Sequence, residues 1–308
     1  MSATGDPLEQ PLEEASFVAL DLEATGLSTF YDPIIEIGAE RFGRDGTVTG
    51  RFQEFVNPGM PIPPRITRLT GIDDSMVANA RSSERVVRDF LAFLAEEPSI
   101  LIAHSIATDL AFLKVACDHF QGTLPDALAV DTLPLSRRFF PEAPDHRLSS
   151  LAALLDTPEE ATFHRALADA AHTRGLFLAC LERAENSLHN TEDLKRYEAV
   201  TLCPPEPVSH PELPERLKGL LDFARQETPV EIIYRGGSRQ PGFRSIIPQS
   251  LFEREGRLYL RAFCNRDDIA KDFRLDRINR LRKARTTDES SPESIDVPAP
   301  SPPASQAH

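Results

Sequence analysis

Between residues 16 and 184, short apolar segments that are typical of strands alternate with longer segments whose apolar residues recur at helical spacing. The expected strands are FVALDL, PIIEIGAERF, RFQEFV, SILIAH and LAVDTL, and the expected helices are SSERVVRDFLAFLAEE, ATDLAFLKVACDHF, RLSSLAALL and ALADAAHTRGLFLACLERAE. The first three strands have short connections and should form a meander, whereas the later ones alternate with helices, which favours parallel pairing. The sequence therefore predicts an α/β domain with a mixed five-stranded sheet.

A proline-rich stretch divides the chain. Five prolines fall within eleven positions: Pro204, Pro205, Pro207, Pro211 and Pro214. Residues 185–214 are therefore predicted to form an extended linker. Residues 215–285 follow with one short helix and four short strands, the last of them KDFRLDRINRL, which predicts a small β-rich domain. Residues 1–15 and 286–308 have the composition of disordered segments.

Charge is distributed unevenly along the chain, whose formal net charge is −14. Pro214–Arg285 holds 17 Lys/Arg and 10 Asp/Glu, a local charge of +7, while the other 236 residues hold 17 against 38, or −21. Such a basic block can bind a polyanion, although a merely solvated basic surface is the alternative. No signal-peptide pattern, metal-type cysteine spacing or apolar run of roughly 20 residues is present, so we expect a cytoplasmic protein without membrane contact.

Two acids interrupt the apolar strand in SFVALDLEATGL. Asp21 and Glu23 are two residues apart and should face the same side of the strand. Paired carboxylates suit Mg²⁺ or Mn²⁺, although a solvated edge strand would also accept them.

Three further residues extend this pattern. Asp109 lies at the start of a predicted helix, where an acid can also serve only the helix dipole. His164 and Asp169 would be about 140° apart on one continuous helix. They can cooperate only if His164 lies on the preceding loop and the helix begins near Ala166. Together the four acids and the histidine predict a two-metal site for phosphoryl transfer, with His164 as the general base.

These residues lie in VALDLEATGL, AHSIATDLAFL and HRALADAAHT, which resemble the three motifs of the DEDDh 3′→5′ exonucleases, the group of the proofreading subunit of bacterial DNA polymerase III. The resemblance covers residues 16 to about 184 and implies a ribonuclease H-like fold and two divalent ions, Mg²⁺ or Mn²⁺. It implies that Asp21 bridges both ions, that Glu23 and Asp169 hold the nucleophile-side ion, that Asp109 serves the other ion, and that His164 is the base.

The same resemblance implies contacts with the terminal nucleotide. The backbone of Thr25 and Gly26 would meet the 3′-hydroxyl, and Leu27 would wedge against the last base. Ser105 and Thr108 stand where the family often has Asn and Phe, so substrate contacts there are expected to be weaker or differently selective.

Residues 215–285 more loosely resemble a WYL domain, a small Sm-like module, in EIIYRGG, RSIIPQSL, LYLRAFC and FRLDRI. This resemblance implies binding of nucleic acid or a nucleotide-like ligand. The candidate residues are Arg244, Arg261, Arg274 and Arg277, with Tyr234 and Tyr259 as stacking partners. Core aromatics with solvated arginines are the alternative.

The leading hypothesis is a metal-dependent exonuclease acting on 3′ ends of single-stranded DNA or RNA, with DNA favoured, in DNA repair or nucleic-acid turnover. We expect it to be nucleoid-associated, with repair or replication proteins as partners, and the sequence does not fix its oligomeric state. The alternatives are a sensing protein with a slow nuclease domain and an RNA-trimming enzyme like oligoribonuclease.

Overall fold

The computed structural model describes residues 11–155, 164–184, 187–203, 205, 212–236, 242–254 and 256–284. The chain forms two compact units, and the main division between them falls between Val208 and Ser209. Among the described residues, no helix combines the length and apolar character needed to cross a membrane.

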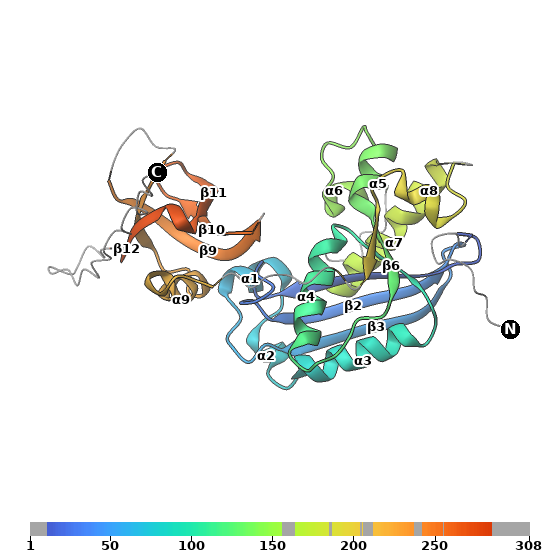
Figure 1. Ribbon diagram of the computed structural model, residues 1–308, viewed down its shortest axis with the longest axis horizontal. Coiled ribbons are helices and arrows are strands. Elements are labelled where there is room, and N and C mark those ends of the chain that lie inside the picture. The colour runs from blue at the N-terminus through green and yellow to red at the C-terminus, as the bar shows by residue number, and fades with distance from the viewer. Residues whose placement is uncertain are drawn as a thin grey trace, which may run out of the picture. The chain divides into compact units, whose positions relative to one another are not determined.

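The first unit is built around a mixed sheet, part of which is labelled in Figure 1. Its strand order is β4-β3-β2-β1-β5-β6-β7. Its strands are β1 (Ser16–Ala24), β2 (Ile34–Gly43), β3 (Val48–Asn57), β4 (Arg81–Ser82), β5 (Ile100–Ala103), β6 (Ala127–Asp131) and β7 (Val200–Cys203). The first three form the predicted antiparallel meander, and β5 and β6 run parallel to β1. This confirms the predicted mixed α/β class, but the sheet has seven strands rather than five.

The helices of this unit cover both faces of the sheet. They are α1 (Pro64–Thr70), α2 (Asp74–Val77), α3 (Ser83–Ala95), α4 (Ile106–Asp118), α5 (Thr132–Phe139), α6 (Leu148–Leu154), α7 (Ala166–Arg183) and α8 (Thr191–Lys195). Val18 and Leu20 of β1 pack with α3 and α4, whereas Phe17 and Ala19 pack with α5, α6 and α7. Since side chains alternate along a strand, Asp21 and Glu23 continue the face that α7 covers.

A close approach between β2 and α7 fixes the start of that helix. A Cβ atom on Gly38 would lie 2.1 Å from the backbone nitrogen of Leu167, so only glycine fits at this position. Gly38 is also the strand partner of Asp21. The first turn of α7 is therefore held against the part of the sheet that carries the predicted acids.

Two predicted boundaries of the first unit are wrong. The segment 11–15 is not a disordered lead, because Leu12 is buried in the core and its N–H donates to the carbonyl of His189 at 2.9 Å. Residues 187–203 are not linker, because they contain α8, which has a capping box between Asn190 and Asp193, and β7, which pairs with β6. The nearby prolines obscured this short strand.

The expected strand LAVDTL also ends earlier than predicted. Asp131 closes β6, and its side chain accepts the N–H of Leu133 as the N-cap of α5. Thr132 and Leu133 are therefore helical. Of the predicted linker, residues 204 and 206–211 lie outside the described part of the chain.

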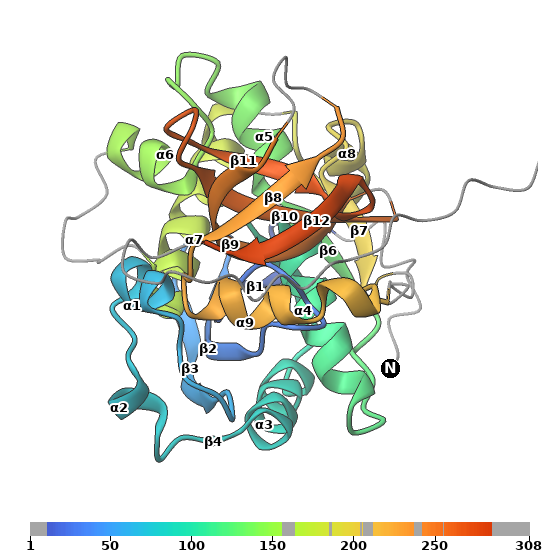
Figure 2. The same cartoon turned by 90° about the vertical axis from the view of Figure 1, so that its left-hand side faces the viewer.

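The second unit is a small antiparallel sheet with the order β11-β10-β9-β8-β12, and α9 (Gly219–Arg225) packs against β9 (Figure 2). Its strands are β8 (Val230–Tyr234), β9 (Arg244–Arg254), β10 (Arg257–Cys264), β11 (Ile269–Arg274) and β12 (Ile278–Lys283). The predicted β-rich domain is confirmed. The expected strand KDFRLDRINRL is instead divided by a 3₁₀ turn at Leu275–Arg277 into β11 and β12, which lie at opposite ends of the strand order. The predicted disordered tail, residues 286–308, lies outside the described residues.

Candidate active site

The two acids of β1 lie at its carboxyl-terminal end. Glu23 is buried, Asp21 is partly buried, and their strand partners on β2 are Glu36 and Gly38. The strand pairing shifts directly after Glu23, so the regular sheet ends there. Both carboxylates therefore project from the edge of the sheet toward α7.

Asp109 reaches the same region from the neighbouring strand. Strand β5 runs parallel to β1, and α4 follows it after a tight turn in which Ser105 has a left-handed φ of 72°. The side chain of Asp131 accepts the N–H of Ser105 at 2.9 Å and so holds this turn. Asp109 lies in the first turn of α4, is buried, and accepts a hydrogen bond from the backbone of Leu22. This hydrogen bond places Asp109 beside β1.

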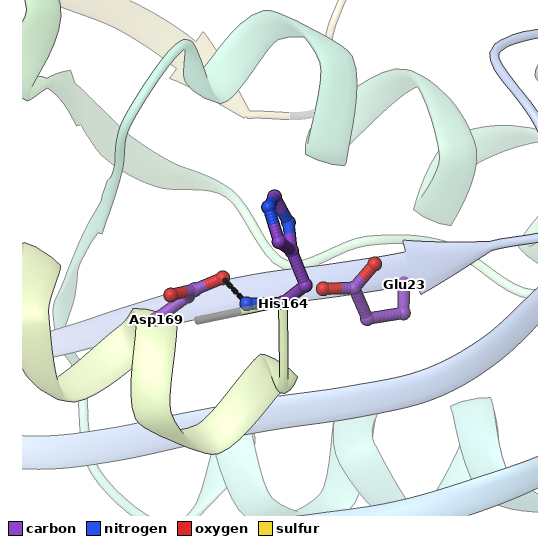
Figure 3. A group of neighbouring side chains, drawn as sticks. All are labelled: Glu23, His164 and Asp169. Atoms are coloured by element: carbon purple, nitrogen blue, oxygen red, sulfur yellow. Dashed lines mark hydrogen bonds between the residues drawn. The ribbon is translucent and has the colours of Figure 1, made fainter. Parts of the chain in front are cut away.

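His164 lies on the loop that leads into α7, which begins at Ala166. This is the arrangement that cooperation between His164 and Asp169 requires. The backbone N–H of His164 donates to Oδ2 of Asp169 at 3.0 Å, and the His164 side chain is exposed. One ligand atom each from Glu23, His164 and Asp169 lie within 4.8 Å of one another, with the two acids on either side of His164 (Figure 3). Asp21 and Asp109 are not part of this group of three.

Burial and mutual repulsion shift the pKa values of the acids upward. Burial, followed by the charges of Asp109 and Asp169, raises the pKa of Asp21 well above its ordinary value. Burial and the charge of Asp169 raise the pKa of Glu23 to about 8, and burial raises the pKa of Asp109 to about 8. Burial also raises the pKa of Asp169 to about 6, against the hydrogen bond from His164. The cluster cannot be fully ionised at neutral pH without a compensating cation.

The residues present fit a divalent cation. Oδ1 of Asp169 is buried and has no hydrogen-bond partner among the described residues. Carboxylate oxygens are the ligands that Mg²⁺ and Mn²⁺ prefer, and an ion would relieve the repulsion that raises the pKa values of these acids. The structure thus brings Glu23, His164 and Asp169 together directly, and it couples Asp21 and Asp109 to them through charge.

The residues expected to contact substrate differ in exposure. Thr25 is buried, and its N–H donates to the carbonyl of Pro33 at 2.9 Å. Leu27 exposes 44% of its surface, and Thr108 is exposed in the first turn of α4 beside Asp109. Their contacts with a nucleotide stay predictions.

His104, next to Ser105, has a structural role. Its Nδ1 is 2.9 Å from Oγ1 of Thr132, and its Nε2 is 2.8 Å from the carbonyl oxygen of His146. Both ring nitrogens are therefore engaged within the fold.

Sequence reasoning missed Glu36, an acid of this site. It is fully buried on β2 and forms an ion pair with Arg165, the residue after His164. The signal that marked Asp21, an acid inside an apolar strand, is equally present at Glu36 in PIIEIGAERF.

The arginines proposed for the second unit are largely engaged with its own acids. Arg261 makes two hydrogen bonds with Asp272, at 2.9 and 3.2 Å, and Arg274 makes two with Asp276, at 3.1 and 2.6 Å. Arg244 is buried, with Nη1 3.7 Å from a carboxylate oxygen of Asp267 and its guanidinium carbon 5.7 Å from the Phe273 ring centre. These positions were proposed as binding residues, and the structure gives them internal partners.

The remaining candidates of this unit also have partners within it. Tyr234 packs edge-on against Phe273, at 5.2 Å between ring centres, and its hydroxyl accepts the N–H of Arg274 at 3.3 Å. Tyr259 stacks on Phe252 at 5.4 Å. Arg277 lies in the 3₁₀ turn and accepts the N–H of Arg235 through its carbonyl at 2.8 Å. Tyr259 and Arg274 are strand partners on β10 and β11.

The family model for exonucleases (RNase_T) matches residues 18–177. The chain belongs to the exonuclease family. A second family model, that of the WYL domain, matches residues 215–283. Both resemblances predicted from the motifs are therefore confirmed, and the exonuclease family to which the chain belongs uses divalent metal ions.

Curated relatives share the exonuclease part of the chain. A Mycobacterium tuberculosis protein named as a candidate bifunctional exonuclease/endonuclease is 39% identical over 198 residues, which is 61% of this chain and 30% of that protein. The PolC-type DNA polymerase III of Bacillus subtilis is 37% identical over 188 residues, 59% of this chain and 13% of that protein. The chain thus spans less than a third of the length of either relative.

Among solved structures, the chain is similar to exonuclease X in complex with 5′-overhanging duplex DNA, with 21% identity and a TM-score of 0.46, covering 59% of this chain and 99% of that one. It is also similar to the nuclease domain of 3′hExo, a DEDDh family member bound to rAMP. That match has 18% identity and a TM-score of 0.48, and covers 57% of this chain and 96% of the other.

Proposed function

We propose that this exonuclease is a metal-dependent 3′→5′ enzyme that hydrolyses phosphodiester bonds at the 3′ end of single-stranded nucleic acid, DNA in preference to RNA. The observation that carries the proposal is the group formed by Glu23, His164 and Asp169, in which an exposed imidazole lies beside buried acids whose pKa values are raised. Strongly shifted acids beside an accessible base are typical of catalytic sites.

Each residue of the site has a role in this proposal. Asp21, Glu23, Asp109 and Asp169 hold two divalent ions, Mg²⁺ or Mn²⁺. When bound, two such ions supply the positive charge that makes water acidic enough to attack and that offsets the charge on the phosphate. A ring nitrogen of His164 accepts the proton of the attacking water and so acts as the general base.

Positions beside the acids recognise the terminal nucleotide. The backbone at Thr25 and Gly26 binds the 3′-hydroxyl, and the Leu27 side chain packs on the last base. Ser105 and Thr108 line the same end of α4 with short side chains. We infer that Ser105 and Thr108 bind the terminal nucleotide less tightly than Asn and Phe would at the same positions.

We propose that the second unit helps to bind the substrate or regulates the activity of the first unit. Its net charge of +7 between Pro214 and Arg285 supports contact with a polyanion, and the WYL assignment supports binding of a nucleic acid or a nucleotide-like ligand. A role in DNA repair or nucleic-acid turnover, close to the nucleoid, fits both units. A ligand-controlled nuclease is the second candidate, and the WYL match is the observation that favours it.

A labelled single strand tests the reaction. The purified chain is incubated with a 5′-labelled DNA oligonucleotide in Mg²⁺, Mn²⁺ or EDTA, beside an Asp169→Ala variant. We expect a ladder that shortens from the 3′ end, requires the metal and is absent with the variant. A parallel reaction with RNA measures substrate preference. Equal cleavage by Asp169→Ala, or cleavage that persists in EDTA, contradicts the proposal.

A further inference from the structure

Glu36 lies among the acids of the site, yet its oxygens are fully occupied. Its Oε2 accepts hydrogen bonds from Nε of Arg165 and from the backbone nitrogen of Ala166, both at 3.1 Å. Its Oε1 accepts from Nη2 of Arg165 at 3.0 Å and from Nε2 of Gln53 at 2.9 Å. A carboxylate offers about four acceptor positions, so Glu36 has none left for a metal ion or for substrate.

Three of the four donors that Glu36 binds belong to the segment that carries His164. Arg165 and Ala166 directly follow His164, and Leu167 lies against Gly38, two residues along β2 from Glu36. Glu36 and Gly38 therefore face the same side of the strand. One side of β2 therefore holds three consecutive residues at the start of α7. The Glu36 carboxylate binds Arg165 and Ala166, and the backbone of Leu167 lies close against Gly38.

His164 needs such support because its backbone is strained. Its φ is 64°, in the left-handed region that residues other than glycine seldom adopt. Backbone strain of this kind persists only where the surroundings enforce it. The N–H of His164 is held by Asp169 on one side, and Arg165 is held by Glu36 on the other.

We propose that Glu36 and Arg165 form a positioning pair that holds the His164 loop in the conformation required for its role as base. The inference rests on the proposed function, because it assigns to these residues an effect on His164. Glu36 and Arg165 themselves touch neither metal nor substrate. Removing the pair would let the loop relax toward an unstrained φ and move the imidazole away from Glu23 and Asp169.

The molecule contains a matched control for this pair. Glu40, four residues along β2, accepts Nε of Arg174 on α7 at 2.8 Å and Nε of Arg51 on β3 at 2.9 Å. The side-chain exposures are 0% and 29% for Glu36 and Arg165, and 4% and 26% for Glu40 and Arg174. Both pairs link β2 to α7, but Arg174 lies nine residues, or about 14 Å, further along the helix.

The first experiment compares Glu36→Gln with Glu40→Gln in the full chain, by the initial rate of DNA hydrolysis at saturating metal. Both changes are isosteric and remove one buried charge from an ion pair. We expect similar losses of thermal stability, but a fall in kcat of about 10- to 100-fold only in Glu36→Gln, because small displacements of a catalytic group have effects of that size. KM should change less than about threefold, since Glu36 does not contact substrate. Arg165→Lys and Arg174→Lys form a second matched pair if either glutamine variant folds poorly.

Two further readouts separate positioning from general stability. In a His164→Ala background, Glu36→Gln should lower the rate by no more than about twofold, because its effect acts through the missing imidazole. Hydrogen–deuterium exchange of residues 164–170 should accelerate about tenfold in Glu36→Gln and stay unchanged in Glu40→Gln. The exchange experiment needs no activity, so it decides the inference even if the wild-type protein hydrolyses nothing and the proposed function fails.

Three results would overturn the inference. The first is a rate for Glu36→Gln within about threefold of wild type. The second is an equal loss of rate in Glu36→Gln and Glu40→Gln. The third is unchanged exchange of residues 164–170 in Glu36→Gln.

Discussion

The two units of the chain differ in what surrounds their acidic side chains. Around β1, buried acids lie near one another, and burial followed by repulsion from Asp169 raises the pKa of Glu23 to about 8. In the second unit the acids lie beside cations. The hydrogen bond from Arg274 lowers the pKa of Asp276, and that from Lys271 lowers the pKa of Asp267.

This difference distinguishes a site prepared for a ligand from a surface that is already neutralised. Crowded acids lower the stability of the metal-free fold, and such an arrangement is expected where function requires it. Arg261 and Arg274 are held by Asp272 and Asp276, so an incoming phosphate must compete with those carboxylates. The acids of the first unit therefore point to function more directly than the arginines of the second.

The largest expected effect is the loss of hydrolysis on removal of an acid from the first unit. Asp21→Asn should reduce the initial rate by roughly 10³-fold or more, because it removes a ligand charge that the metal ions require. Asp272→Asn, in the second unit, should leave the hydrolysis of a short oligonucleotide within about threefold of wild type. Comparable rates for the two variants would contradict the contrast between the units.

Removal of divalent metal should make stability depend on pH. The pKa of Glu23 rises from its ordinary 4.5 to about 8, and that of Asp109 from 3.8 to about 8. Between about pH 4 and pH 8 the folded protein therefore retains protons that the unfolded chain has released, and the free energy of unfolding falls as pH rises through this window. Melting temperatures in EDTA should fall from pH 5 to pH 8, and the gain in melting temperature on adding Mn²⁺ should grow with pH.

Asp21→Asn tests whether the acid cluster is the source of this behaviour. The variant should raise the free energy of unfolding of the metal-free protein at pH 8 by about 1–2 kcal/mol, or roughly 2–8 °C, because it removes a carboxyl group whose ionisation is opposed by burial and by the neighbouring acids. It should also flatten the pH dependence, whereas Asp272→Asn should not. The same slope in wild type and Asp21→Asn would assign the pH dependence to the remaining acids of this acidic chain.

A smaller effect is expected when an arginine of the second unit is released from its acid. Asp272→Asn frees Arg261, so binding of single-stranded DNA in EDTA should tighten about two- to fivefold at low salt, and its salt dependence should steepen. Asp268→Asn, on the turn before β11, changes the net charge equally and serves as the control. Fluorescence anisotropy with a labelled oligonucleotide measures the affinity of both variants and its dependence on salt. Equal tightening by the two variants would indicate a general effect of charge.

The sequence identified the acids of the site but not the residues that hold the surrounding backbone in place. Asp21 and Glu23 were found because charged residues inside an apolar strand are costly unless something compensates them. Glu36 carries the same signal but was not singled out, because its partner Arg165 is 129 positions away and only the fold brings them together. The requirement for glycine at position 38 could not be predicted from the sequence either, because it arises from the packing of α7 on β2.

The errors in the fold have a related cause. Strand β7 lies beside a proline cluster, and its place in the sheet depends on pairing with β6 rather than on any local pattern. In KDFRLDRINRL the apolar residues alternate only at Phe273 and Leu275 and then recur every third residue at Ile278 and Leu281, and the 3₁₀ turn at Leu275–Arg277 lies where this spacing changes. Local sequence patterns predicted most of the strands and helices. Pairing between strands that are far apart in the sequence determined the position of β7 and the separation of β11 from β12.

The smallest predicted effect concerns Ser105, whose left-handed φ of 72° lies at the start of α4. Asn tolerates this backbone region better than Ser, so Ser105→Asn should raise the free energy of unfolding by about 0.5 kcal/mol, or roughly 1–2 °C in melting temperature. It should also lower KM for a short DNA strand by no more than about threefold, because an amide side chain can reach the terminal nucleotide. Ser149→Asn, the same change at an exposed position in the first turn of α6, is the control and should change neither quantity measurably. If Ser105→Asn lowers the melting temperature, the hydrogen bond between the Ser105 backbone and Asp131, rather than the residue's own preference, sets the geometry of this turn.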